Sequence, residues 1–77
     1  YTEAPILTIF GDKYFECENF EGNIVYKIYN LQGQLVFAGK TNNNVQNVLP
    51  VNSPGLYIIN ANDEKNNITS SKFKVLK

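Results

Sequence analysis

The side chains that could carry out chemistry are few, and none has the partner that a reaction requires. The 77-residue chain contains no histidine, which removes the usual general base near neutral pH and the commonest metal ligand. Cys17, Ser53, Ser70 and Ser71 therefore lack an activating base. Ser71 and Lys74 fit a Ser-x-x-Lys pattern, but that pattern needs a helix, and on a strand the two side chains point to opposite faces. The sequence predicts no catalytic residue and no enzyme.

Two carboxylates, Glu16 and Glu18, lie two positions apart, so on a strand they share one face. Paired carboxylates can perform acid–base chemistry or bind a hard cation. A half-buried strand requires the same alternation, with Phe15 and Cys17 toward the core and the two glutamates in solvent. We favour this second interpretation, in which Cys17 is a small buried apolar residue.

The other acidic residues considered, Asp12, Asp63 and Glu64, lie at predicted turns. A calcium site needs about six or more oxygen ligands, and no Asp-x-Asp-x-Asp-Gly loop supplies them here. We therefore expect these residues to stabilise turns, and we predict no metal and no cofactor.

The balance of charge argues against two classes of partner. Seven lysines balance seven acidic residues, there is no arginine, and the formal net charge is zero. A nucleic-acid-binding protein normally carries a basic excess to neutralise phosphates. The chain also lacks an apolar stretch of about 20 residues and a basic amphipathic helix. We expect no nucleic-acid partner and no membrane insertion.

Four aromatic residues, Tyr26, Tyr29, Phe37 and Tyr57, have two possible roles. They could form a stacking platform for sugars or bases, and a platform for sugars would make the chain a carbohydrate-binding or adhesive module. In a small β-domain, aromatic residues are more often core residues or cross-strand pairs. We favour the core and cross-strand role, and the carbohydrate-binding or adhesive module stays as the alternative function.

The elements that position these residues are short extended segments. Seven can be identified, at residues 6–10, 14–17, 24–29, 35–38, 45–49, 56–60 and 68–76. Turn signals recur about every ten residues, and no helical period is seen. The predicted fold is therefore all-β: one domain over residues 1–77, forming a seven-stranded, mainly antiparallel, immunoglobulin-like β-sandwich without a helix longer than one turn.

Local patterns define faces and turns within this fold. Ile24, Tyr26 and Ile28 alternate with more polar positions, so we assign them to the core face. Segments 24–29 and 35–38 should form a hairpin, because a tight turn that includes Gly33 separates them. We expect Gly33 or Gly55, or both, to adopt positive φ.

The alternation of residues in the last segment, 68–76, predicts which of its side chains face the core. Phe73 and Val75 should point into the core, while Lys72 and Lys74 should stay in solvent. Lys77 has the parity of Phe73, but it should be free of the sheet because it is the last residue.

Three stretches together resemble a known family. They are residues 27–34 (KIYNLQGQ), 53–59 (SPGLYII) and 72–77 (KFKVLK). The first is similar to a strand followed by Tyr-Asp/Asn, two residues, Gly and a polar residue. The second is similar to a Gly-apolar-Tyr-apolar strand entry, and the third to a closing strand with a basic residue at or near the chain end. In this order and spacing they resemble the type A sorting domains that end many proteins secreted by the type IX system of Bacteroidetes.

This resemblance implies a function without catalysis. The domain would be a C-terminal secretion signal that takes an N-terminal passenger across the outer membrane and is usually removed by a sortase. The implied partners are components of the type IX translocon, the sortase and the upstream passenger domain. The implied location is the periplasm in transit, and then the cell surface or the medium. The residues that we expect to be recognised are Tyr29, Asn30, Gly33, Gly55, Tyr57, Lys72, Lys74 and Lys77.

Self-association should be slight. A sandwich leaves unpaired backbone groups at its edge strands, and a net charge of zero offers little mutual repulsion. We expect at most a weak homodimer through an edge strand.

Overall fold

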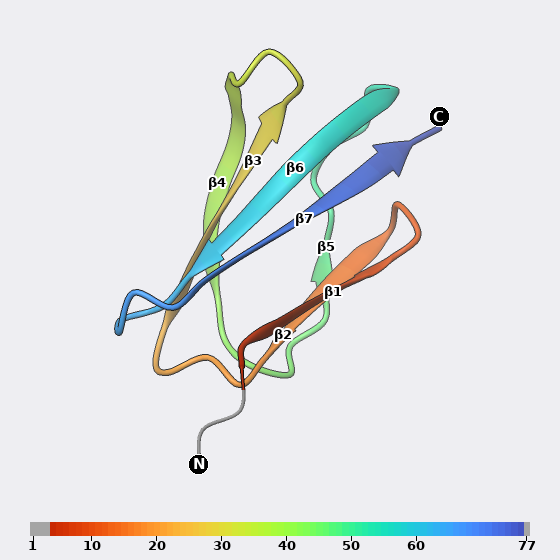
Figure 1. The fold of residues 1–77 in the computed structure, drawn as a ribbon. Coiled ribbons are helices and arrows are strands. Elements are labelled where there is room, and N and C mark those ends of the chain that lie inside the picture. Colours follow the sequence, from red (N-terminus) through yellow and green to blue (C-terminus); the bar gives the residue numbers. More distant parts are fainter. Residues whose placement is uncertain (1–3, 77) are drawn as a thin grey trace.

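Seven strands make up the fold of residues 4–76, which are the residues described by a computed structural model of the chain. The strands are β1 (Ile6–Phe10), β2 (Tyr14–Glu18), β3 (Ile24–Asn30), β4 (Leu35–Thr41), β5 (Asn47–Val48), β6 (Gly55–Asn62) and β7 (Ile68–Val75). They form a three-stranded sheet in the order β1-β2-β5 and a four-stranded sheet in the order β4-β3-β6-β7. All paired strands are antiparallel. Figure 1 shows the smaller sheet lying against the larger one. The prediction of a seven-stranded antiparallel sandwich is confirmed.

The order of the strands differs from one immunoglobulin pattern by a single strand. In the constant-type arrangement the first, second, fourth and fifth strands share one sheet. Here β4 pairs with β3 and so belongs to the sheet that also contains β6 and β7. The immunoglobulin-like assignment therefore stays a prediction at this level of detail.

The core lies between the sheets and follows the predicted alternation. Ile24, Tyr26 and Ile28 of β3 are buried, and so are Phe15 and Cys17 of β2. The remaining buried apolar residues are Phe20, Leu49, Val51, Tyr57, Ile59, Ala61, Phe73 and Val75. The alternation of apolar and polar residues thus predicted the core faces of these strands correctly, because successive side chains of a strand point to opposite faces of the sheet.

Several predicted boundaries were wrong by a few residues. β4 extends through Lys40 and Thr41, beyond the predicted end at residue 38, because both residues pair with β3. β5 is shorter than the predicted 45–49, and β6 is longer than the predicted 56–60. Backbone pairing, unlike side-chain burial, does not require apolar residues, so a polar end of a strand is hard to detect in a sequence.

Both glycines singled out above adopt positive φ, as predicted. Gly33 has φ 82° and Gly55 has φ 148°. The Gly33 N–H donates to the carbonyl of Asn30 at 3.0 Å, which closes the turn between β3 and β4. A Cβ at Gly33 would meet no atom within 4 Å, so only the backbone conformation disfavours a side chain there.

Replacing Gly33 by alanine should therefore lower the free energy of unfolding by about 1 kcal/mol. The matched control is Gly33→Asn, because asparagine tolerates left-handed backbone better. Three asparagines of this chain, Asn19, Asn44 and Asn66, already have φ between 61° and 64°. Urea unfolding should rank the wild type first, then Asn, then Ala. An alanine variant as stable as the wild type would contradict this account of the turn.

Candidate recognition surface at one end of the larger sheet

The three stretches of the resemblance meet at one end of the four-stranded sheet. Asn30 at the end of β3 pairs with Tyr57 near the start of β6, which pairs with Phe73 of β7. Gly55 pairs with Val75 in the same region. Figure 1 shows the β3–β4 turn, the start of β6 and the end of β7 at the end of the molecule opposite the N-terminal side. We call this region the motif end.

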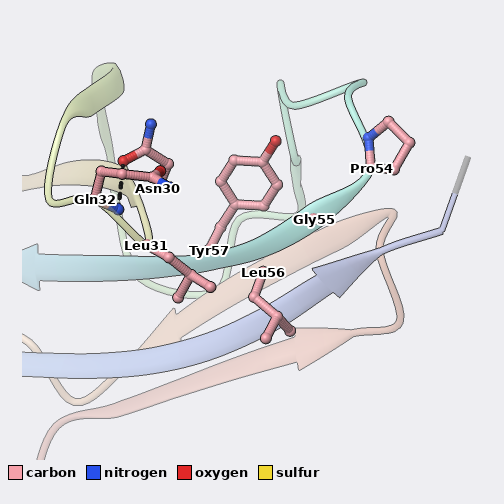
Figure 2. Close-up of a pocket in the computed structure, with 7 residues that line it drawn as sticks. All are labelled: Asn30, Leu31, Gln32, Pro54, Gly55, Leu56 and Tyr57. Atoms are coloured by element: carbon pink, nitrogen blue, oxygen red, sulfur yellow. Dashed lines mark hydrogen bonds between the residues drawn. The ribbon is translucent and has the colours of Figure 1, made fainter.

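The motif end carries an open hollow of about 300 Å³. It is lined by Asn30, Leu31 and Gln32 of the β3–β4 connection and by Pro54, Gly55, Leu56 and Tyr57 of the β6 entry. In Figure 2 the side chains of Leu31 and Leu56 point to one side of the sheet, and that of Tyr57 points to the other. The hollow is thus built where the first and second stretches meet.

Asn30 holds the β3–β4 turn together. Its side-chain Oδ1 accepts the backbone N–H groups of Gln32 and Gln34, both at 3.0 Å. Its Nδ2 donates to the Oε1 of Gln34 at 2.9 Å. An asparagine side chain that accepts backbone N–H groups two and four residues ahead fixes a tight turn. The contacts of Asn30 therefore position the turn.

Tyr57 is an internal support of the β6 entry. It is 7% exposed, and its ring stacks on that of Phe73 with 5.5 Å between centroids. Its hydroxyl donates to the carbonyl of Ser53 at 2.9 Å, four residues upstream. A tyrosine near the start of the sixth strand that bonds back to upstream backbone is a feature of immunoglobulin-like sandwiches. This corner fixes the path of the chain from Ser53 into β6.

The predicted recognition residues divide into two groups. Gly33, Gly55, Asn30 and Tyr57 shape the backbone of the motif end, as described above. Tyr29, Lys72 and Lys74 lie on the outer face of the larger sheet, away from the core. Lys72 and Lys74 are exposed, as predicted, and flank the buried Phe73. Lys77 lies outside the described residues.

Pairing between strands places side by side several residues that are far apart in the sequence. Ile58 pairs with Tyr29 on one side and with Lys72 on the other, and Leu56 pairs with Lys74. The sequence did not identify Leu31 and Leu56 as surface residues, although their side chains are 60% and 45% exposed. Only strand pairing brings these residues together, so no local sequence signal could have shown it.

The four aromatic residues of the alternative function mostly pack inward or against one another. Tyr26 and Tyr57 are buried, and Tyr29 is half-buried. Phe37 is exposed on one side, but its ring stacks on Tyr26 with 6.0 Å between centroids. The prediction of core and cross-strand roles is confirmed for Tyr26, Phe37 and Tyr57.

The thiol of Cys17 is buried. Burial raises the pKa of the Cys17 thiol to about 11, which disfavours the thiolate at neutral pH. Residues 4–76 contain no cluster of three or more metal-ligating side chains.

The same part of the chain contains no helix long and apolar enough to cross a membrane.

Asp63 is a buried carboxylate that joins two connections. Its Oδ2 accepts the N–H of Glu21 at 2.7 Å and the Nδ2 of Asn67 at 2.9 Å. Its Oδ1 accepts the N–H groups of Lys65 and Asn67, both at 2.9 Å. Burial alone would raise the pKa of Asp63, but these hydrogen bonds favour the charged form and lower the pKa to about 2. Asp63 thus ties the β2–β3 connection to the β6–β7 turn.

Replacing Asp63 by asparagine should lower the melting temperature by on the order of 10 °C, because the new NH₂ group would face two N–H donors. The pKa is lower in the folded state than the ordinary value of 3.8, so the stabilisation is present above about pH 4 and is lost as the pH falls through 2. The gap between the wild type and Asp63→Asn should therefore narrow from pH 7 to pH 2. Thermal melts followed by circular dichroism would measure it, with Asp12→Asn as the control. A constant gap would rule out this role for the carboxylate charge.

A known family matches most of the chain. The family model described as "Secretion system C-terminal sorting domain" matches residues 12–75, which include β2 to β7. No curated protein and no solved structure matches the chain.

Proposed function

Because the chain belongs to the family of secretion system C-terminal sorting domains, we propose that it carries an N-terminal passenger through the periplasm and across the outer membrane. Membership of this family makes the chain a C-terminal sorting signal for type IX secretion. It implies interaction with the type IX machinery and export to the cell surface or the medium. The family is a signal domain and not a catalytic one.

The observation that carries the proposal is the family match over residues 12–75. The matched region includes the β3–β4 turn and the β6 entry, which share one hollow at the motif end. A compact end that combines three parts of the chain suits a signal that is recognised in folded form.

The specific partners belong to the proposal. Translocon components would bind the domain, and a sortase would then separate it from the passenger. The residues that would contact the secretion machinery are Tyr29, Lys72, Lys74 and Lys77. Asn30, Gly33, Gly55 and Tyr57 would hold the motif end in shape, as their hydrogen bonds and φ angles indicate.

A reporter fusion tests the function directly. The 77 residues are placed after an inert reporter that carries a leader for export to the periplasm, in a type IX-competent bacterium and in its translocon-deficient mutant. We expect the reporter at the cell surface or in the medium only in the competent strain and only with the domain attached. Retention of the reporter in the periplasm of both strains would overturn the proposal.

A further inference from the structure

The outer face of the four-stranded sheet is basic near the motif end. Lys27 of β3 and Lys72 and Lys74 of β7 are all exposed. Lys27 and Lys74 each lie between two buried residues, and Lys72 lies between half-buried Ser71 and buried Phe73. Within residues 4–76, none of the three lysines forms an ion pair with a carboxylate. Lys72 and Lys74 lie about 7 Å apart along the strand, within the Debye length at physiological salt, so their fields add.

Apolar side chains lie between these lysines. Tyr29, Ile58 and Lys72 form one row across three strands, and Leu56 pairs with Lys74 in the next row. Lys27 and Tyr29 line one shallow hollow on the same face. Leu56 is almost half exposed, while Tyr29 and Ile58 are half-buried. We call this surface, formed by Lys27, Tyr29, Leu56, Ile58, Lys72 and Lys74, the basic face.

The acidic residues of the described chain lie elsewhere. Glu16 and Glu18 are on the outer side of the smaller sheet, because their neighbours Phe15 and Cys17 point into the core. Asp63 and Glu64 are in the β6–β7 turn, at the other end of the larger sheet from the motif end, and Glu21 accepts a hydrogen bond from Asn67 of the same turn. Asp12 is in the β1–β2 turn of the smaller sheet. The formal net charge of zero therefore conceals a segregation of charge between surfaces.

We propose that the basic face is the surface by which the domain docks on the secretion machinery, against a protein surface with an apolar centre and an acidic rim. This inference rests on the proposed function and deepens it. An apolar centre with charged residues around it is the common arrangement of a protein–protein interface, and complementary charges speed and orient encounter. The proposal adds Lys27, Leu56 and Ile58 to the contact residues and makes the signal a face of the folded sheet.

The number of lysines favours a protein over an anionic membrane. A lysine close to an anionic membrane contributes about 1 kcal/mol, so the three lysines of the basic face together with Lys40, which lies opposite Val25 on the same side of the sheet, would give about 4 kcal/mol. This corresponds to a dissociation constant of about 1 mM. Segments that bind anionic lipids commonly gather four to eight basic residues, so this side of the sheet reaches only the lower limit.

A second copy of the chain fits the basic face less well. Its complementary surface would be the one that carries Glu16 and Glu18, on the other sheet of the sandwich. Such head-to-tail contacts do not close with two copies and lead to open chains. A separate acidic partner avoids this.

The test uses a charge reversal with a matched control in the reporter fusion. The variant Lys27→Glu with Lys72→Glu changes the basic face on two strands. The control Lys13→Glu with Lys65→Glu changes the net charge equally, in the β1–β2 and β6–β7 turns. We expect export to fall about tenfold in the first variant and to stay near the wild-type rate in the control, while both melt within about 5 °C of the wild type.

The outcomes separate the two proposals. Normal export of the folded Lys27/Lys72 variant overturns the docking face and leaves the sorting function intact, whereas an unexported wild-type fusion overturns both. If the Lys27/Lys72 variant melts far below the wild type, Lys27→Ser with Lys72→Ser replaces it, and normal export of that pair overturns the docking face.

Two further measurements test whether an anionic membrane or a second copy of the chain binds the basic face instead of a protein of the secretion machinery. Co-sedimentation of the wild-type chain with vesicles of phosphatidylglycerol and phosphatidylcholine, lost in the Lys27/Lys72 variant, would replace the protein partner by a membrane. Self-association in sedimentation velocity, removed equally by reversal of Lys27/Lys72 or of Glu16/Glu18, would replace it by a second copy. The expected result is neither vesicle binding nor self-association of this kind.

Discussion

Replacing Phe73 by alanine is expected to lower the free energy of unfolding by about 3–5 kcal/mol, the usual cost of truncating a buried phenylalanine. Phe73 is 5% exposed and lies in the core of β7. Its ring stacks on Tyr57, whose hydroxyl holds the carbonyl of Ser53. Loss of the ring therefore leaves a cavity and also removes the surface that positions the β6 entry.

The size of the chain makes this loss severe. Small domains are commonly stable by only about 5–15 kcal/mol, and a 77-residue sandwich buries a limited core. The matched control is Lys74→Ala on the same strand, which should change stability by about 0.5 kcal/mol or less. Urea unfolding followed by circular dichroism would measure both. Equal stability of the two variants would mean that β7 does not pack as described.

Alternation within single strands was enough to predict which side chains enter the core. On β7 the order of apolar and polar residues placed Phe73 and Val75 inside and Lys72 and Lys74 outside. This works because a one-residue slip would exchange the two faces. It failed at β4, where residues from Leu35 to Ala38 are all exposed. Because these four residues show no alternation of buried and exposed positions, the sequence of β4 showed that a strand was present but not where it ended.

Pairing between strands was beyond the reach of the sequence. The row Tyr29–Ile58–Lys72 combines residues up to 43 positions apart, and only the order β3-β6-β7 brings them together. The hydrogen bond between Glu21 and Asp63 depends in the same way on two distant connections. The resemblance identified most residues of the motif end, because each family stretch is local. Lys27, Leu56 and Ile58 lie within these stretches, but the resemblance did not mark them as recognition residues, because their place on the basic face comes from strand register.

Changing Lys72, Lys74 and Lys77 together to serine is expected to leave a folded domain that no longer exports its passenger. Lys72 and Lys74 are exposed on an edge strand and form no ion pair within the described residues. Serine at these positions removes three charges but leaves the core and the hydrogen bonds of the β3–β4 turn untouched. The melting temperature should therefore change by only a few degrees. The passenger of the triple variant should accumulate in the periplasm, which is also the result expected for the wild-type fusion in a translocon-deficient strain.

The control for this triple variant is Lys13, Lys40 and Lys65 changed to serine, which alters the net charge equally. Lys13 and Lys65 lie in turns. Lys40 is on the outer face of the larger sheet, opposite Val25 and beside Asp63 and Glu64, at the other end of that sheet from the motif end. This control should export normally if position, and not total charge, is what the machinery recognises.

Comparison with Lys27→Glu and Lys72→Glu then separates two forms of signal. A signal confined to the chain end would tolerate Lys27→Glu by itself, whereas a docking face would not. Surface delivery by the folded triple serine variant at the wild-type rate would show that the machinery recognises neither the closing lysines nor the face to which they contribute.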